Sequence, residues 1–113
     1  MFSKLKDWLR GYPVFGAQAR SSKWRKVRHA HLLKNPFCAV CGGEKKLEVH
    51  HIVMFNQDPS RELDPTNLLT LCESKKNGVT CHQFFGHLGN YSRINPDVVS
   101  DANMWYNKLK GRQ

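Results

Sequence analysis

The stretch Leu47-Glu48-Val49-His50-His51 decides how the core of this chain can fold. Its first four residues alternate between apolar and polar side chains, which predicts a β-strand. Leu68-Leu69-Thr70-Leu71 predicts a second strand. The connection between them, residues 52–67, is long and has little regular pattern, and such a loop inside a small domain is usually functional. Within it, Asp64-Pro65-Thr66-Asn67 is a turn signal that leads Asn67 back into the sheet.

Helices are predicted before the two strands. Apolar residues at helical spacing within residues 2–9 predict a short amphipathic helix that ends at Gly11. Ser21 or Ser22 can cap a second helix that runs to about Leu33, and the following Asn-Pro pair stops it.

Helices are also predicted after the two strands. A short helix can begin near His82, although Gly86 weakens it. Asn95-Pro96 suits the cap and the first position of a last helix that ends at Gly111. Its apolar face, which we expect in the core, carries Val98, Ala102, Trp105 and Leu109.

The length of 113 residues fits one domain with a thin core, so a cross-link or a bound metal would help to stabilise it. We assign residues 1–20 to an N-terminal arm and residues 21–113 to a single domain. Strands flanked by helices make the expected fold class α+β.

Basic residues are concentrated at the front of the chain. The formal net charge is +9, and residues 1–34 contain nine Lys and Arg against one acidic residue, Asp7. Such a segment is the usual footprint of a nucleic-acid binder, because each cation near a phosphate releases a condensed counterion. A solvated basic tail or an anionic membrane surface is the weaker alternative. The residues expected to contact the DNA backbone lie on the second predicted helix: Lys23, Arg25, Lys26 and Arg28.

The cysteines point to a metal rather than to disulfides. No apolar run is long enough for a bilayer span or a signal segment, so we expect a cytoplasmic protein. In that reducing compartment cysteines are more often metal ligands. Cys38-Ala39-Val40-Cys41-Gly42-Gly43 has the form of a zinc knuckle, whose glycines allow a tight turn. Cys72 and Cys81 would complete a structural four-cysteine zinc site, with buried free thiols as the alternative.

This order of residues resembles the HNH endonuclease family, and more closely its small zinc-containing members from phages and mobile elements. The resemblance covers roughly residues 20–110. It is carried by Ser21-Ser22-Lys23-Trp24-Arg25, the Cys38 and Cys41 pair, Leu47-Glu48-Val49-His50-His51, Asn67 and Cys81-His82. The resemblance implies a ββα-metal core stapled by the four-cysteine zinc site, with flanking N- and C-terminal helices.

The resemblance also implies roles for individual residues. His51 matches the family's general base, and Asn67 matches the residue that fixes the loop around that base. His50 and His82 would hold the catalytic divalent metal. The position of His50 is often aspartate in the family, so the ligands here bring no compensating charge. Magnesium prefers oxygen ligands, and manganese, nickel or zinc would therefore serve at least as well.

His87 is a candidate third ligand or phosphate contact. It lies five residues after His82, and five residues of a regular α-helix turn about 140° away from the starting face. We therefore expect His87 to point away from the metal unless Gly86 kinks the helix.

The sequence thus predicts a metal-dependent DNA endonuclease that nicks DNA or cuts both strands, as a monomer or a homodimer and with no membrane partner. Phosphate contacts carry no sequence information, so weak specificity is expected. Two alternatives stay open: a zinc-stapled DNA-binding or regulatory module that does not cleave, and a nuclease that prefers RNA.

Overall fold

A two-stranded antiparallel sheet forms the centre of the part of the chain described by the computed structural model, residues 20–74 and 80–111. Strand β1 spans Leu47–His51 and strand β2 spans Leu68–Cys72. In the register, Leu47 lies opposite Cys72 and His51 lies opposite Leu68. Both strands begin where the sequence predicted them and extend one residue further. The predicted α+β fold of ββα-metal type is confirmed.

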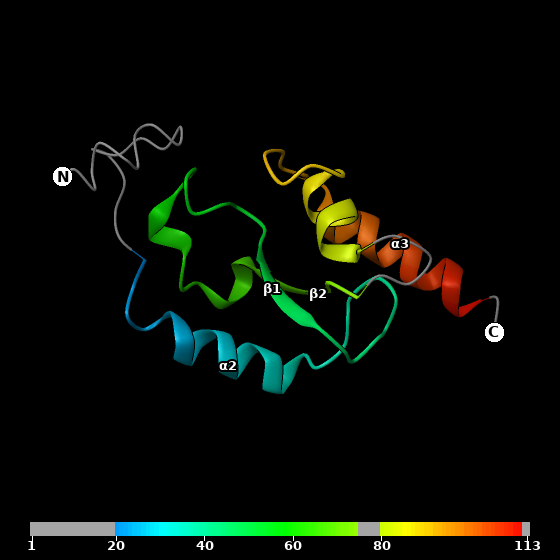
Figure 1. The fold of residues 1–113 in the computed structure, drawn as a ribbon, viewed down its shortest axis with the longest axis horizontal. Helices are drawn as coiled ribbons and strands as arrows, with labels where there is room; N and C mark the ends of the chain where they lie inside the picture. The colour runs from blue at the N-terminus through cyan, green and yellow to red at the C-terminus, as the bar shows by residue number, and fades with distance from the viewer. Residues whose placement is uncertain (1–19, 75–79, 112–113) are drawn as a thin grey trace.

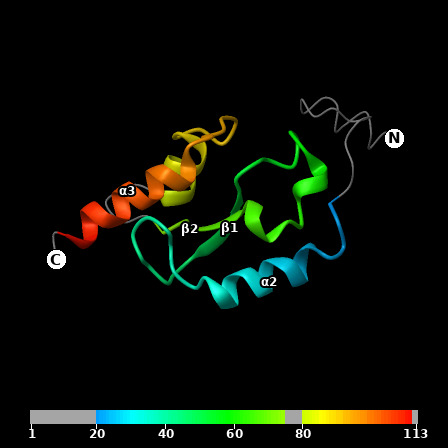
Figure 2. The same cartoon turned by 180° about the vertical axis from the view of Figure 1, so that it is seen from behind.

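Helices cover the two faces of this sheet. Helix α2 (Trp24–Lys34) packs against both strands from one side. The short helix η3 (His82–Gly86) packs on both strands from the other side, and α3 (Val98–Lys110) packs on η3 (Figure 1). The view from behind shows the same order of layers (Figure 2). The sheet therefore separates the basic helix from the C-terminal helices.

Helix α2 begins slightly later than the sequence predicted. Lys23 is its N-cap residue and makes no side-chain cap. Ser21 lies just before the helix, and its Oγ accepts a hydrogen bond from the backbone N–H of Lys23 at 3.0 Å. The helix ends at Lys34, one residue beyond the predicted end. The short helix predicted within residues 2–9 lies outside the described residues.

The start of α3 also differs from the prediction. Its N-cap residue is Asp97 rather than Asn95. The Asn95 side chain is buried and accepts a hydrogen bond from the backbone N–H of Asp97 at 2.9 Å. Its amide group donates to the carbonyl oxygen of Phe85 at 2.8 Å and to the carboxylate of Asp101 at 2.9 Å. Asn95 therefore ties α3 to η3, which is the element that presents His82.

The connecting loop contains two 3₁₀ turns, η1 (Pro59–Arg61) and η2 (Pro65–Asn67). In each turn, the preceding aspartate, Asp58 or Asp64, accepts a hydrogen bond from the backbone N–H two residues later, at 3.1 and 2.9 Å. These side-chain caps give the loop a defined course. The predicted turn at Asn67 is confirmed.

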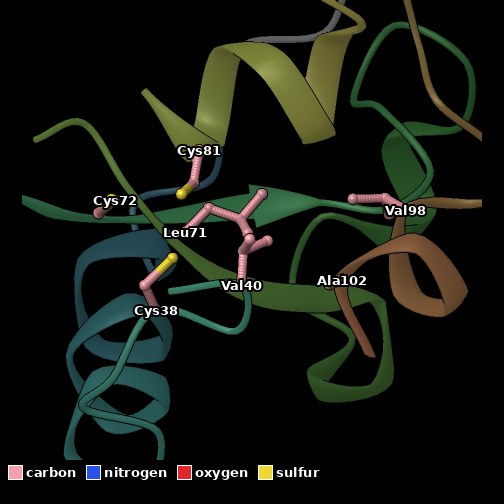
Figure 3. Close-up of a cluster of buried hydrophobic side chains, with 7 residues drawn as sticks. All are labelled: Cys38, Val40, Leu71, Cys72, Cys81, Val98 and Ala102. Atoms are coloured by element: carbon pink, nitrogen blue, oxygen red, sulfur yellow. The ribbon is translucent and has the colours of Figure 1, made fainter. Parts of the chain in front are cut away.

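The core is small and lies beside the cysteines. Figure 3 shows Leu71 and Val40 between the sulfur atoms of Cys38 and Cys81 on one side and α3 residues on the other. Of the predicted core face of α3, Val98 and Ala102 are buried, whereas Trp105 and Leu109 are 36% and 37% exposed. The core therefore covers the first half of α3. Within the described ranges, no helix is long and apolar enough to cross a membrane.

Candidate active site

Three histidines from separate positions meet on the η3 side of the sheet. His50 comes from β1, His82 is the first residue of η3, and His87 follows the last residue of η3. The ring centroids of His50 lie 5.2 Å from His82 and 4.9 Å from His87, and the latter two are 4.9 Å apart. One nitrogen from each ring lies within 4.8 Å of the others. This spacing allows one ion to contact all three imidazoles.

His87 does not point away from His82, as a regular α-helix would have required. Residues 82–86 form a π-helix, in which hydrogen bonds join residues five apart and each turn is wider than in an α-helix. Residues five apart therefore approach one face. The sequence-based argument failed because it assumed the α-helical period of 3.6 residues.

The chemistry of the three imidazoles fits a divalent metal. His82 Nδ1 lies 2.5 Å from the Glu73 carboxylate, and His87 Nδ1 lies 2.8 Å from the carbonyl oxygen of Arg93. Both acceptors lack hydrogen, so each Nδ1 carries the proton and each Nε2 keeps its lone pair. Metal-ligating histidines usually have such a bond from the other ring nitrogen. The residues present therefore fit the metal that the ββα-metal fold implies.

The surroundings of His50 also favour a bound cation. Both of its ring nitrogens are buried, and neither has a hydrogen-bond partner in the described part of the chain. Burial, together with the nearby charges of His82 and His87, lowers the pKa of His50 to about 3. His50 is thus neutral at physiological pH, with a lone pair facing the other two rings. An unsatisfied buried nitrogen is costly, and a bound cation would remove that cost.

Gly86 lets η3 approach this ring. A Cβ atom at position 86 would lie 3.0 Å from both Cε1 and Nδ1 of His50. Such a contact is shorter than ordinary van der Waals distance, so the ring would have to move. The glycine that weakens the helix in the sequence therefore has a packing role next to a candidate ligand.

His51 lies at the end of β1 and faces away from the cluster, toward α2. Its Nε2 lies 2.9 Å from the backbone carbonyl oxygen of Glu62, so Nε2 carries the proton and Nδ1 keeps the lone pair. The ring packs against Trp24, with centroids 4.6 Å apart. Burial lowers the pKa of His51, although the Glu62 carbonyl opposes this shift. The structure therefore supplies a neutral imidazole with a fixed tautomer, which is the form a general base needs.

Asn67 fixes the loop that contains Glu62. It is fully buried, and its Oδ1 accepts a hydrogen bond from the backbone N–H of Val53 at 2.7 Å. Its Nδ2 donates to the carbonyl oxygens of Val53 at 2.9 Å and Arg61 at 3.1 Å. One side chain thereby joins the two ends of the loop around His51.

A pocket of about 260 Å³ lies beside His51 and is lined by Trp24, Arg20 and Arg28. The Arg20 guanidinium is also 3.7 Å from the buried Glu62 carboxylate. The lining also includes Glu48, whose carboxylate lies 3.5 Å from Arg28. Guanidinium groups can bind phosphate oxygens through several N–H donors at once, so two of them beside a neutral imidazole are suited to a phosphodiester.

The basic residues of α2 do not all have the same surroundings. Lys23, Arg25 and Lys26 are exposed. Arg28 is partly buried, and its Nη2 donates to the carbonyl oxygen of Leu47 at 3.4 Å and lies 3.5 Å from the Glu48 carboxylate. Arg28 therefore also attaches α2 to β1.

The four predicted cysteine ligands form a second cluster. Their sulfur atoms lie within 4.8 Å of one another, and Cys41 and Cys72 are 3.7 Å apart. Gly42 has a φ angle of +75°, and its N–H donates to the Cys38 carbonyl oxygen at 2.9 Å, which closes the predicted knuckle turn. The cluster could hold a zinc ion. The sequence Asn77-Gly78 favours a turn that would bring Cys81 back toward Cys72, but it lies outside the described residues.

The protonation of the thiols also favours a cation. A hydrogen bond from Cys81, with smaller contributions from backbone amides, lowers the pKa of Cys38. The same hydrogen bond and burial raise the pKa of Cys81, and burial raises that of Cys41. One thiolate therefore suppresses ionisation of its neighbours. A cation reverses this effect, since all four sulfurs can then be thiolates.

Sequence reasoning missed several residues around these clusters. Glu73 bonds His82, and its bond to Tyr91 joins positions 18 residues apart, which no local pattern reveals. Its place directly after Cys72 was a usable signal. No sequence signal indicated the roles of Glu62 and Arg20, because these roles depend on how the loop folds back over β1.

A comparison with protein-family models matches residues 38–83 to a model described as HNH endonuclease. The matched range contains the four cysteines and four of the candidate site residues, His50, His51, Asn67 and His82, and it ends before His87. Searches of curated proteins and of solved structures found no match.

Proposed function

We propose that this chain hydrolyses DNA phosphodiester bonds. Residues 38–83 form a domain of the HNH endonuclease family, whose members are metal-dependent nucleases that act on DNA. In this proposal His51 is the general base, and His50, His82 and His87 hold the catalytic divalent ion. The observation that carries the proposal is the pair of neighbours at the end of β1. His50 belongs to the three-histidine cluster, and His51 is a neutral imidazole with its proton fixed on Nε2.

His51 acts through its free Nδ1. That nitrogen accepts a proton from a water molecule as the water attacks phosphorus, the bond between phosphorus and the 3′ oxygen breaks, and the released 3′ oxygen takes a proton from solvent. The products carry a 5′-phosphate and a 3′-hydroxyl. The carbonyl oxygen of Glu62 stabilises the imidazolium that forms, because it accepts the Nε2–H bond throughout. A well-positioned base contributes about 10²- to 10⁴-fold to the rate.

The three histidines hold the ion through nitrogens that the structure leaves unprotonated. When bound, a divalent metal stabilises the negative charge that develops on the phosphate and the leaving oxygen. A ligand set of three neutral imidazoles favours manganese, nickel, cobalt or zinc over magnesium. The hydrogen bonds from His82 to Glu73 and from His87 to the carbonyl oxygen of Arg93 would keep these two rings oriented toward a bound ion.

Basic side chains bind the DNA backbone on the α2 side. Arg20 and Arg28 line the pocket at His51, and Lys23, Arg25 and Lys26 extend the positive surface along the exposed part of the helix. These contacts supply affinity without sequence readout, so cleavage has little sequence preference.

The four cysteines hold a structural zinc. The cysteines that would hold it lie in the knuckle, at the end of β2 and directly before η3, and Cys81 directly precedes the candidate ligand His82. Zinc binding therefore contributes to folding and also sets the position of a catalytic ligand.

The test is a plasmid-cleavage assay with wild type and a His51→Ala variant across manganese, nickel, cobalt, zinc and magnesium, with the cut ends sequenced. We expect nicking by wild type only, with 5′-phosphate ends. A wild type that shows no activity above the variant, while both retain the plasmid in a binding assay, would replace the nuclease by a non-cleaving DNA-binding module. Faster digestion of structured RNA than of DNA in a parallel assay would change the substrate and keep the mechanism.

A further inference from the structure

The carboxylate of Glu73 is hydrogen-bonded to His82, one of the three clustered histidines. Glu73 follows the last residue of β2, and its backbone N–H donates to the carbonyl oxygen of Lys46 at 2.7 Å, which continues the pairing of the two strands. Its Oε2 accepts the hydrogen bond from His82 Nδ1 at 2.5 Å. The backbone of the sheet therefore fixes where this carboxylate meets the ring.

Tyr91 also binds the Glu73 carboxylate. Its hydroxyl donates to Glu73, at 2.8 Å from Oε1 and 2.7 Å from Oε2. The Tyr91 ring also packs beside the His82 and His87 rings, with centroids 5.6 and 5.0 Å away. Since both partners of Glu73 are donors, its carboxylate is held in one orientation with its charge retained.

The three imidazoles lack the negative charge that an aspartate ligand would bring. A divalent ion bound by neutral ligands keeps its full positive charge in a partly buried site, which is unfavourable without a nearby anion. Among residues 20–74 and 80–111, Glu73 is the acidic residue that hydrogen-bonds to a ring of the cluster. A carboxylate in this position raises the basicity of the ligand nitrogen and partly neutralises the ion.

We propose that Glu73 is a positioning residue for the catalytic metal. It fixes the tautomer and direction of His82, and through its hydrogen bond to His82 Nδ1 it supplies, across the ring from the Nε2 that would hold the ion, the negative charge that the ligand set lacks. Tyr91 supports it by fixing the carboxylate. This inference rests on the metal site proposed at His50, His82 and His87.

The experiment measures metal affinity rather than cleavage. Protein that holds one zinc per chain, at the four cysteines, is titrated with cobalt(II), and binding is followed by calorimetry and by the visible absorption of the bound cobalt. The variants are Glu73→Gln, which keeps the shape and an acceptor oxygen but loses the charge, and Tyr91→Phe. Glu44→Gln is the matched control, because it removes the same charge from an exposed position. A His50→Ala variant identifies the signal of the three-histidine site.

We expect Glu73→Gln to weaken cobalt binding about 10- to 100-fold and to change the absorption spectrum of the bound ion. Tyr91→Phe should weaken binding less, and Glu44→Gln should leave it unchanged. Equal cobalt affinity and spectra in Glu73→Gln and Glu44→Gln would overturn the role of Glu73 and leave the metal site standing. A wild type with no cobalt signal beyond that of His50→Ala would overturn both the metal site and this inference.

Discussion

His51 donates its Nε2–H to the carbonyl oxygen of Glu62 at 2.9 Å, and this bond joins the end of β1 to the middle of the connecting loop. The loop has to keep this carbonyl in place for the imidazole to keep its tautomer. Asn67 keeps the carbonyl in place through its hydrogen bonds to the backbone of Val53 and of Arg61, the residue before Glu62. The orientation of the proposed base thus depends on a buried amide that does not touch it.

The first prediction concerns this amide. Asn67→Ala leaves the backbone N–H of Val53 and the carbonyl of Arg61 without their partner in a buried region, which should cost roughly 2–4 kcal/mol of unfolding free energy. The same variant should lower kcat and leave the KM for DNA largely unchanged, because the proposed DNA contacts lie on α2 and at Arg20, away from Asn67. Urea unfolding and cleavage kinetics measure the two effects, with the exposed Asn103→Ala as control. A folded Asn67→Ala protein with wild-type kcat would contradict this role.

The second prediction uses the close contact between η3 and His50. Gly86→Ala adds a Cβ atom 3.0 Å from the His50 ring, and the ring should shift by a few tenths of an ångström. Cobalt affinity at the three-histidine site should fall on the order of tenfold, as expected when the support of a ligand is disturbed. Gly111→Ala, at the end of α3, is the control, since its added Cβ meets only helix carbonyls at 3.4 Å or more. Equal cobalt affinities in the two variants would show that the ring accommodates the methyl group.

Several local elements of the fold could be predicted from the sequence. The first strand was predictable from its alternating residues and the second from its short apolar run, although helices cover both faces of the sheet and successive residues of each strand are buried. The turn at Asn67 was predictable because Asp64 and Pro65 favour it locally. The cysteine cluster followed from residue types and spacing. Patterns within a few residues of one another were therefore sufficient for the two strands, this turn and the knuckle.

The surroundings of the histidines could not be predicted in the same way. A π-helix has no periodic signature in five residues, so the position of His87 depended on packing between Gly86 and His50. The bond between Glu73 and Tyr91 exists only because η3 and the chain after it fold back over the end of β2. Such tertiary contacts carry no signal in local periodicity.

The third prediction separates DNA contacts from structural contacts on α2. Lys26→Ala and Arg25→Ala should each reduce the slope of log K against log salt concentration by about 1, because each removes one phosphate contact. Arg28→Ala should in addition lower the unfolding free energy by about 1 kcal/mol, since its guanidinium also bonds to Leu47 and Glu48. Fluorescence anisotropy at several salt concentrations and thermal unfolding distinguish the two effects. Unchanged salt slopes in Lys26→Ala and Arg25→Ala would remove α2 from the DNA interface.

The fourth prediction couples the two metal sites. In a Cys38→Ser/Cys41→Ser variant, native mass spectrometry should show the loss of one zinc per chain, with a large decrease in melting temperature. Cobalt affinity at the histidines should decrease as well, because Cys81 no longer anchors the start of η3 beside His82. Wild type stripped and reloaded with zinc is the control. A variant with an unchanged melting temperature would argue against a structural zinc.

The fifth prediction concerns His31, a partly buried residue of α2 outside both metal clusters. Its Nε2 is buried and has no partner within the described ranges, and burial lowers its pKa below the ordinary histidine value of 6.5. The unfolded chain therefore binds a proton at this residue more readily than the folded chain does. The contribution of His31 to stability is present above pH 6.5 and is lost as the pH falls toward the lowered pKa of the folded state.

His31→Leu should consequently flatten the dependence of unfolding free energy on pH between about pH 7.5 and pH 5.5. Urea unfolding at several pH values measures this slope. His29→Leu, exposed on the same helix, controls for the loss of a histidine that is not buried. Other buried histidines contribute to the slope in every variant, so the difference between the His31→Leu and His29→Leu curves isolates one residue. Parallel curves for these two variants would mean that His31 is protonated equally in the folded and unfolded chains, and that its burial does not exclude the proton.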